Sequence, residues 1–214
     1  EDISLRALKV LQSARYLVCE DSRMFNNLWS KLIQMGLAQK FEGKIRFVND
    51  FNEYRALPKI VEEMSGLDEA VLVSDAGMPL ISDPGYKLVN ECLKNDWTVD
   101  VVPGPTAESA ALAVSGLPTD RYLFVGFLPK KGGKRLQTLK EIKEIGDKTK
   151  MTVVIYESPM RIAKILPEVA MIFGEEAPAS LAIDLTKVSQ KIMRGSLTEM
   201  IKTVETTKIK GELV

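Results

Sequence analysis

Short apolar runs alternate along the whole chain with segments in which apolar residues recur every three or four positions. The first pattern is typical of buried strands and the second of helices with one buried face. Strands that alternate with helices predict βα units, and therefore an α/β fold with mainly parallel sheets. The predicted strands are residues 16–19, 45–48, 70–73, 99–102, 122–127, 151–156 and 180–183, and the predicted helices are residues 3–13, 25–35, 58–64, 86–94, 107–115, 136–145, 161–173 and 197–204.

One segment interrupts this alternation in a way that is typical of a domain linker. Residues 116–119, Gly-Leu-Pro-Thr, follow a predicted helix and contain both residue types that most strongly end regular structure. We therefore expect two α/β domains, residues 1–117 and residues 118–214. The length of 214 residues is sufficient for one large or two small domains.

The composition narrows the functional classes. Lys and Arg together number 29, as do Asp and Glu, so no global charge draws the chain to nucleic acid or membrane. Histidine is absent, which excludes a Ser-His triad and the usual zinc ligands. Cys19 and Cys92 have no metal-binding spacing, so two buried thiols in a cytoplasmic protein are expected. No apolar run is long enough for a membrane helix and no signal peptide is present, so no membrane attachment is expected.

The loop at residues 74–85 is the strongest candidate for a ligand site. It follows an apolar strand and contains two aspartates, Asp75 and Asp83, together with two glycines and two prolines. In open α/β sheets, ligands bind beyond the carboxyl ends of strands. The loop matches no phosphate-binding motif, and its carboxylates would repel phosphate. It suits a cationic ligand, such as the ammonium and sulfonium groups of S-adenosylmethionine. The alternative is a tight structural turn.

Further polar segments follow other predicted strands. Each has a structural alternative, namely a rigid turn, a capped helix or a solvated charge cluster. They are residues 20–23 (Glu-Asp-Ser-Arg), 103–107 (Pro-Gly-Pro-Thr-Ala), 130–135 (Lys-Lys-Gly-Gly-Lys-Arg), 156–161 (Tyr-Glu-Ser-Pro-Met-Arg) and 184–187 (Asp-Leu-Thr-Lys). Residues 130–135 read as a mobile basic loop that could grip a phosphate backbone.

Several of these motifs together carry a resemblance to a known family. Residues 73–86 (Val-Ser-Asp-Ala-Gly-Met-Pro-Leu-Ile-Ser-Asp-Pro-Gly-Tyr), 102–107, 115–122, 126–131 and 156–161 occur in that order. They resemble the bacterial 16S ribosomal RNA (cytidine-2′-O)-methyltransferases of the tetrapyrrole methylase superfamily. The resemblance covers essentially the whole chain.

The resemblance implies two α/β domains with S-adenosylmethionine in the cleft between them, a homodimer, and 16S rRNA in the small ribosomal subunit as substrate. It implies an N-terminal domain whose first strand, with a Pro-Ile-Gly-Asn loop, is missing here. Histidines that the family commonly carries near residues 49–53 are also absent. The cofactor-binding residues expected by motif, together with the loop carboxylate of Asp75, are Asp75, Gly77, Met78, Ile81, Thr106, Ala107, Glu157, Leu185 and Gly211.

The implied reaction is an in-line displacement on an already activated methyl group by a ribose hydroxyl. Asp21, Glu157 and Lys187 are candidates to assist loss of the hydroxyl proton, and the sequence does not choose among them. Arg23, Arg161 and the 130–135 loop are expected to hold RNA phosphates.

Three rival readings stay open. The first is a methyltransferase of the same fold that acts on a tetrapyrrole or a protein side chain. The second is a noncatalytic RNA-binding module. The third is a magnesium phosphotransferase that uses Asp75 and Asp83.

Overall fold

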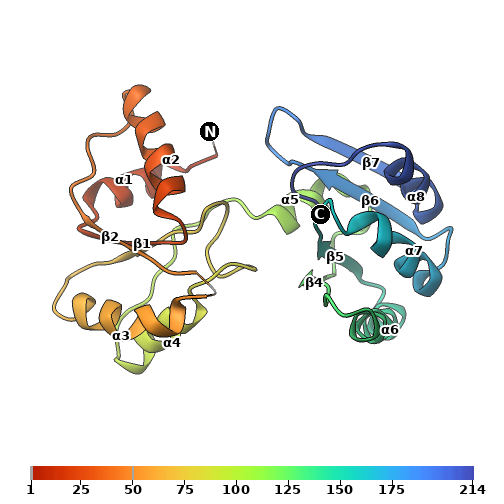
Figure 1. The fold of residues 1–214 in the computed structure, drawn as a ribbon, viewed down its shortest axis with the longest axis horizontal. Helices are drawn as coiled ribbons and strands as arrows, with labels where there is room; N and C mark the ends of the chain where they lie inside the picture. The colour runs from red at the N-terminus through yellow and green to blue at the C-terminus, as the bar shows by residue number, and fades with distance from the viewer. Residues whose placement is uncertain (1, 50) are drawn as a thin grey trace. The chain divides into compact units, whose positions relative to one another are not determined.

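The computed structural model describes residues 2–49 and 51–214 and divides the chain into two compact units, Glu1–Thr106 and Ala107–Val214. Both units appear in Figure 1. The predicted boundary after residue 117 placed helix α5 (Ala107–Ser115) in the first domain, whereas the structure groups it with the second unit. The physical reason is packing, because α5 contacts three strands of the second unit.

The first unit is built on a parallel three-stranded sheet, as the alternating pattern predicted. Its strands are β1 (Tyr16–Cys19), β2 (Lys44–Phe47) and β3 (Val71–Leu72), in the order β2-β1-β3. The central strand β1 is buried along its whole length, which explains why it reads as a continuous apolar run.

Helices cover both faces of this sheet. Leu17 and Cys19 point to the face covered by α1 (Leu5–Ser13) and α2 (Ser22–Gln34). Tyr16 and Val18 point to the opposite face, which is covered by α3 (Glu53–Met64) and α4 (Tyr86–Lys94). Figure 1 shows the two helix pairs on either side of the strands. The period-two alternation along β1 thus divides the apolar residues between two cores.

Two strand predictions in this unit were wrong or too long. The predicted strand 99–102 forms no ladder, and Val99 and Val101 are 43% and 58% exposed. Burial of these side chains therefore does not stabilise a strand here. β-branched residues alone do not make a strand. The predicted strand 70–73 contracts to the two residues of β3.

The second unit contains two separate strand pairs. Strands β4 (Tyr122–Phe127) and β5 (Thr152–Tyr156) are parallel and are connected through α6 (Gly132–Thr149). Strands β6 (Pro178–Ile183) and β7 (Lys191–Ser196) form an antiparallel hairpin. The sequence analysis missed β7, because its exposed positions interrupt any apolar run.

Helices α7 (Ile162–Phe173) and α8 (Leu197–Thr206) contact each other and pack on this hairpin. The segment Glu212–Val214 pairs with both strand systems, because Glu157 N donates to Leu213 O at 3.1 Å and Ala182 N donates to Val214 O at 2.9 Å. This segment therefore ties the end of β5 to β6. Within the described part of the chain, no helix is long and apolar enough to cross a membrane.

Candidate functional site

The carboxyl edge of the first sheet brings together three predicted site residues. Asp21 follows β1 and Asp75 follows β3, and parallel strands place both at the same edge. The backbone N–H of Asp21 donates to Asp75 Oδ1 at 3.1 Å. The Asp21 carboxylate in turn accepts from the backbone N–H of Arg23 and from its guanidinium, with the closest contact at 2.6 Å. Two strand-end loops are thus linked by one chain of polar contacts.

The electrostatics of this edge separate the roles of the two aspartates. Hydrogen bonds from Arg23 lower the pKa of Asp21 to about 2. Burial, and secondarily the Asp21 charge, raise the pKa of Asp75. A general base works best with a pKa near the operating pH. The Asp21 carboxylate, ionised and engaged by Arg23, is therefore a poor proton acceptor near neutral pH.

The loop after β3 lies directly against the segment 103–106. Gly77 has φ +75°, and a Cβ at this position would lie 3.2 Å from Pro105 O. A Cβ on Gly104 would lie 3.4 Å from Met78 Sδ. Glycine permits both the left-handed backbone and the close approach. The two loops that the sequence singled out therefore form one glycine-lined surface in the first unit.

The same loop holds unusual backbone conformations. Leu80 and Ser82 have φ +71° and +66°, which non-glycine residues rarely adopt. Ser74 Oγ donates to the carbonyls of Ala76 and Gly77 at 3.2 and 3.1 Å and closes the turn. Strained residues persist only where the surrounding structure fixes them, and they cluster at ligand sites. The predicted contact Ile81 lies between Leu80 and Ser82 in the chain and is 40% exposed.

Helix α5 begins at Ala107, directly after Thr106, as the sequence predicted. Its first turn is fastened to the end of β5 by a pair that sequence reasoning missed. Tyr156 Oη donates to Glu108 Oε2 at 2.6 Å and accepts from Glu108 N at 3.1 Å. Glu108 is buried. The only signal for it in the sequence is its position directly after the predicted site residue Ala107. The predicted residue Ala107 is thereby held near the carboxyl end of β5.

Glu157 is the most informative side chain of the second unit. It is 5% exposed, and its Oε1 accepts from Ser158 N at 2.7 Å and contacts Arg161 Nε at 3.3 Å. Among the described residues, Oε2 has no hydrogen-bond partner. A buried carboxylate oxygen without a partner is costly, so it indicates a place where a ligand can donate a hydrogen bond.

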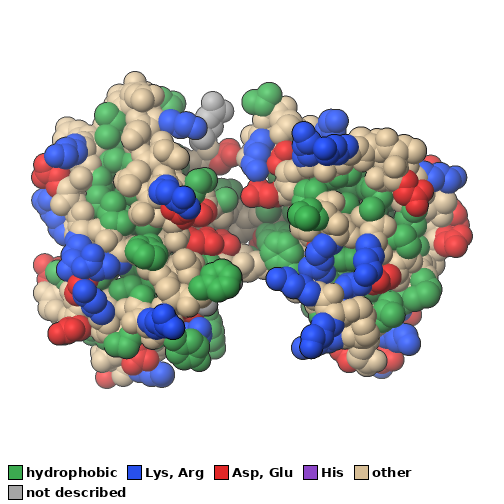
Figure 2. Space-filling model, viewed as in Figure 1, with side chains coloured by type: hydrophobic (Ala, Val, Ile, Leu, Met, Phe, Trp, Pro, Cys, Tyr) green, Lys and Arg blue, Asp and Glu red, His purple; other side chains and the backbone are tan. Residues whose placement is uncertain are grey.

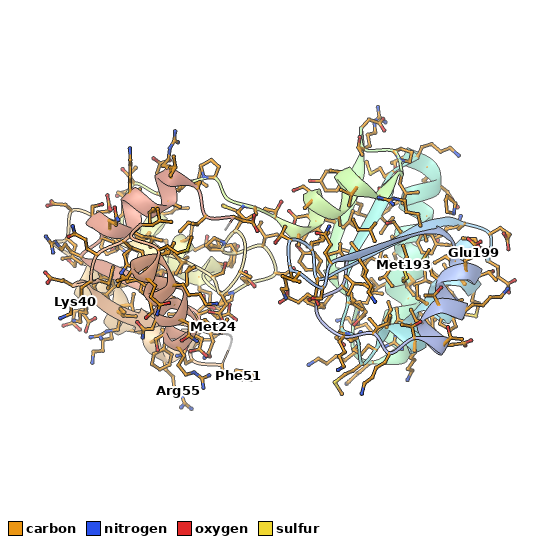
Figure 3. All side chains as sticks on the ribbon, turned by 90° about the horizontal axis from the view of Figure 1, so that it is seen from above. Met24, Lys40, Phe51, Arg55, Met193 and Glu199 are labelled. Atoms are coloured by element: carbon orange, nitrogen blue, oxygen red, sulfur yellow. The ribbon has the colours of Figure 1, made fainter. Side chains whose placement is uncertain are left out.

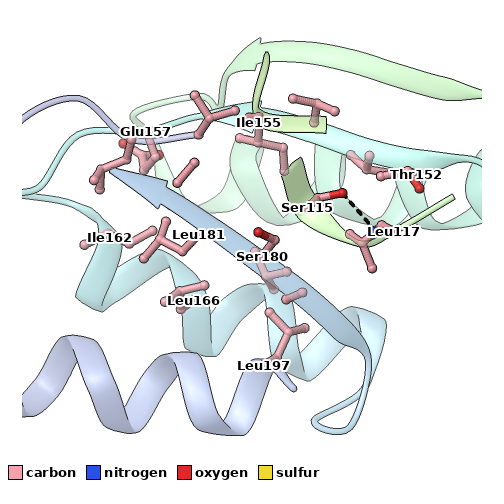
Figure 4. Close-up of a pocket in the computed structure, with 18 of the residues that line it drawn as sticks. Ser115, Leu117, Thr152, Ile155, Glu157, Ile162, Leu166, Ser180, Leu181 and Leu197 are labelled. Carbon is pink, nitrogen blue, oxygen red and sulfur yellow. Dashed lines mark hydrogen bonds between the residues drawn. The ribbon is translucent and has the colours of Figure 1, made fainter. Parts of the chain in front are cut away.

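Glu157 lines a cavity of about 140 Å³ in the second unit. Figure 4 shows this cavity among the strands β5 and β6 and helix α7, with Glu157, Ile155, Ile162 and Leu181 around one part of it. Most of its lining is apolar, and the Glu157 carboxylate is the charged side chain among the lining residues. A mostly apolar cavity with a few placed polar groups is typical of a small-molecule site.

The segment after β6 forms a second polar cluster. Asp184 has φ +48° and accepts from Ser189 Oγ at 2.8 Å, Glu212 N at 3.2 Å and Lys187 Nζ at 3.2 Å. A Cβ on Gly211 would overlap the Asp184 carboxylate, so only glycine fits there. The predicted residues Lys187 and Gly211 are thus brought together, and the half-buried Leu185 lies between Asp184 and Lys187 in the chain. Sequence reasoning missed Ser189, which carries no motif signal.

The charges in this cluster are mutually satisfied. The Ser189 hydroxyl, the Glu212 N–H and Lys187 lower the pKa of Asp184. Glu212, which accepts from Lys187 Nζ at 2.8 Å, and Asp184 raise the pKa of Lys187. An ammonium held by two carboxylates stays protonated and has no lone pair with which to accept a proton. The structure therefore disfavours Lys187 as a general base.

The basic segment 130–135 differs from its prediction as a mobile loop. Helix α6 starts at Gly132, and Arg135 is 2% exposed. Its guanidinium pairs with Glu168 at 2.6 and 2.7 Å and donates to the carbonyls of Pro129 and Lys130. Arg135 is therefore a structural residue and is not accessible to an RNA phosphate.

Arg161 has a similar, partly structural position. Its Nη2 donates to Leu128 O at 2.9 Å, its Nε contacts Glu157, and its side chain is 25% exposed. Arg23, by contrast, is 87% exposed. In the part of the chain that the structure describes, no group of three or more acidic or cysteine side chains is arranged to hold a metal ion.

Comparison with known proteins gives a consistent result. Residues 1–201 match the family described as Tetrapyrrole (Corrin/Porphyrin) Methylases. A protein of Thermotoga maritima named Ribosomal RNA small subunit methyltransferase I is 38% identical over 216 residues, which cover 100% of this chain and 90% of the relative. Proteins of the same name from Vibrio cholerae and Mesorhizobium japonicum are 39% and 38% identical; the matches cover 100% and 92% of this chain but 71% and 63% of those relatives.

The fold has a counterpart among solved structures. The X-ray structure of the cobalamin biosynthetic enzyme cobalt precorrin-4 methyltransferase, CbiF, matches with a TM-score of 0.61 over 99% of this chain and 87% of that chain, at 16% identity. This likeness confirms the predicted α/β fold. The chain belongs to the tetrapyrrole methylase family, and within it to the group of relatives named ribosomal RNA small subunit methyltransferase I.

Proposed function

We propose that this protein is an S-adenosylmethionine-dependent methyltransferase that methylates the ribose 2′-hydroxyl of a cytidine in 16S rRNA. The relatives' names support an rRNA substrate, and the motifs at residues 73–86 and 156–161 support the finer assignment. The observation that carries the proposal is the buried, unpartnered Oε2 of Glu157 beside an apolar cavity, because it calls for a ligand that donates a hydrogen bond.

The residues present fit such a cofactor. In the first unit, the glycine-lined surface of Gly77 and Gly104 leaves backbone accessible, and Asp75 supplies a carboxylate. In the second unit, Glu157 offers its free oxygen. The remaining proposed contacts are Met78, Ile81, Thr106, Ala107, Leu185 and Gly211. When bound, S-adenosylmethionine supplies a methyl group that its sulfonium has already activated.

The chain's own contribution is mainly positioning. Holding two reactants in line can supply ~7–11 kcal/mol of barrier reduction in favourable cases. Of the three groups proposed to assist proton loss, Asp21 and Lys187 are engaged by opposite charges, whereas Glu157 keeps one oxygen unengaged among the described residues. Arg23 is the exposed cation at the sheet edge and is proposed, with Arg161, to contact RNA phosphates.

The motif resemblance also supports a cytoplasmic homodimer that acts on the small ribosomal subunit. A tetrapyrrole acceptor is the rival that the family description favours.

The test uses the full-length protein with labelled S-adenosylmethionine. Small ribosomal subunits from cells that lack the gene are compared with precorrin substrates, and the modified nucleotide is mapped. We expect label in one cytidine ribose and none in precorrins. Label in precorrins alone would refute the rRNA assignment.

A pair of glycine variants tests the proposed surface. Gly77→Ala introduces a Cβ at 3.2 Å from Pro105 O, whereas Gly36 has nearly the same φ, +71°, with nothing within 4 Å. Both variants place a side chain at a similar positive φ. We expect Gly77→Ala to weaken binding of S-adenosylhomocysteine in calorimetry and Gly36→Ala to leave it unchanged; equal affinities would contradict the assignment of this loop.

A further inference from the structure

The start of helix α3 presents aromatic and cationic side chains to solvent. Phe51, just before the helix, is 97% exposed, and Tyr54 is 78% exposed. Arg55, Pro58 and Lys59 are also exposed, and their spacing places them along the same side of the helix as Tyr54. We call these five residues the α3 face. In Figure 3, Phe51 and Arg55 point outward from the body of the first unit.

Exposed aromatic side chains of this kind require an explanation. Single exposed apolar residues are ordinary, but clustered ones mark interaction sites. The buried side of α3 is already satisfied by Ile60 and the partly buried Ala56 and Leu57, which pack in the core. The aromatic rings of the α3 face are therefore not needed for the packing of this unit.

The ring of Tyr54 is held in place. The Lys87 ammonium lies 3.9 Å from the centroid of this ring. Lys87 is fixed in turn by Glu53, which is 5% exposed, accepts from Lys87 N at 3.2 Å and pairs with Lys87 Nζ at 2.9 Å. A cation over one ring face stabilises the ring orientation. Tyr54 is thus a preorganised platform whose remaining surface is exposed.

The charges of the α3 face favour a polyanion. Arg55 and Lys59 are its two charged residues, and among the described residues of helix α3 the next exposed acid along this side is Glu62, beyond the aromatic part. The nearby Glu53 carboxylate is buried and neutralised by Lys87. Figure 2 shows hydrophobic, cationic and acidic side chains interspersed on the first unit as a whole. Aromatic rings interleaved with cations are the composition that binds unpaired nucleotides, the rings stacking on bases and the cations contacting phosphates.

We propose that the α3 face binds a single-stranded segment of RNA, with Phe51 and Tyr54 stacking on unpaired bases and Arg55 and Lys59 contacting the backbone. The inference rests on the proposed function, since it assigns part of the RNA contact to this surface. It locates this contact on residues that the sequence analysis assigned to no site. A protein partner, including a second copy of this chain, is the alternative that the experiment must separate.

The experiment measures binding of the full-length protein to a fluorescent oligoadenylate of about 12 nucleotides. The same oligonucleotide paired with oligouridylate serves as the duplex probe. We expect the single strand to bind more tightly, because only unpaired bases can stack on the rings. Phe51→Ala and Tyr54→Ala should each weaken single-strand binding by roughly 5- to 150-fold, the range for loss of one stacked base.

Salt dependence distinguishes the two kinds of contact. The aromatic variants should keep the slope of log affinity against log salt, whereas Arg55→Gln and Lys59→Gln should each flatten it by roughly 0.7. Tyr54→Phe, which keeps the ring, should bind as the wild type does. The matched control is Tyr122→Ala, which removes a 43% exposed aromatic from the second unit and should leave RNA binding unchanged.

Three outcomes would overturn the proposal. They are wild-type protein that fails to bind the single strand, aromatic variants that bind it as tightly as the wild type, and variants that alter only self-association in sedimentation. Methyl transfer to small ribosomal subunits is measured in parallel with the wild type. Absence of that transfer would defeat the proposed function, whereas normal transfer with unchanged variant binding would defeat only the role of the α3 face.

Discussion

The ion pair between Arg135 and Glu168 yields a sharp prediction about stability. The Arg135 side chain is 3% exposed and the Glu168 side chain 21%, and two short hydrogen bonds join them. Arg135 also donates to the carbonyls of Pro129 and Lys130, so it fixes the turn between β4 and α6. Arg135→Ala removes the pair and both carbonyl contacts in one step.

The magnitude follows from the burial of the pair. Removing one partner of a buried ion pair costs ~3–5 kcal/mol, because the other charge is left without compensation. Water can reach Glu168 in part, so we expect the lower end of the range, about 3 kcal/mol. With a urea dependence of ~1–3 kcal/mol per molar, this corresponds to a midpoint lower by about 1–3 M. Lys134→Ala, an exposed neighbour in α6, should stay within ~0.5 kcal/mol of the wild type.

Two optical probes make the assay specific. The chain has two tryptophans, Trp29 and Trp97, and both lie in the first unit. Tryptophan fluorescence therefore reports on the first unit, whereas circular dichroism reports on the helices of both. We expect Arg135→Ala to lower the urea midpoint seen by circular dichroism. A midpoint equal to that of Lys134→Ala would refute the structural role of Arg135.

The pH dependence provides an independent check of the same pair. The hydrogen bonds from Arg135 lower the pKa of Glu168 in the folded protein. A carboxylate whose pKa is lowered on folding stabilises the folded state above its unfolded pKa, about 4.3, and that stabilisation is lost as the pH falls through the folded pKa. The stability difference between wild type and Arg135→Ala should therefore be full near neutral pH and shrink below pH ~4. A difference that grows on acidification would contradict this account.

Three further predictions concern the site. Gly211→Ala drives a Cβ into the Asp184 carboxylate, so we expect ~1–3 kcal/mol of destabilisation in urea unfolding; unchanged stability would contradict the tight fit. Tyr156→Phe removes the hydroxyl partner of the buried Glu108 carboxylate and should cost ~1–3 kcal/mol in the same assay, whereas a neutral result would mean that Glu108 finds another donor. The Asp21 carboxyl should titrate near 2 in an NMR pH series and move up towards its ordinary value when the arginine two residues along is replaced by alanine; an unmoved titration would show that this arginine is not the cause.

Most of the first unit could be predicted from the sequence, because its signals are local. The apolar residues Tyr16–Cys19 predict a central strand, and Asp21 after it caps helix α2 by accepting from Arg23 N. The prediction of a strand at 99–102 was wrong because strand formation also depends on long-range pairing. Whether β-branched residues join a sheet depends on neighbouring strands, and no local pattern reports whether a neighbour is within reach.

The sequence located the loops of the candidate site but not the contacts between them. Gly77 was a predicted site residue and Gly104 lies in the segment 103–107 that the sequence singled out, whereas their close approach to Pro105 and Met78 appears only in three dimensions. The basic segment 130–135 shows most clearly which contacts the sequence could not predict. Arg135 looked like its lysine neighbours, and its burial depends on Glu168, which lies far along the chain and carries no motif. Long-range pairing of charges leaves no periodic trace in a sequence.

The contacts of segment 212–214 have a consequence for biosynthesis. The loop that carries Glu157 is anchored by Leu213, and the backbone of Asp184 donates to Glu212 O. Both anchors are translated after every helix of the second unit. The core between the β6–β7 hairpin and helices α7 and α8 includes Leu213, so this core and the backbone anchor of Glu157 can both be completed only after residues 212–214 have been synthesised.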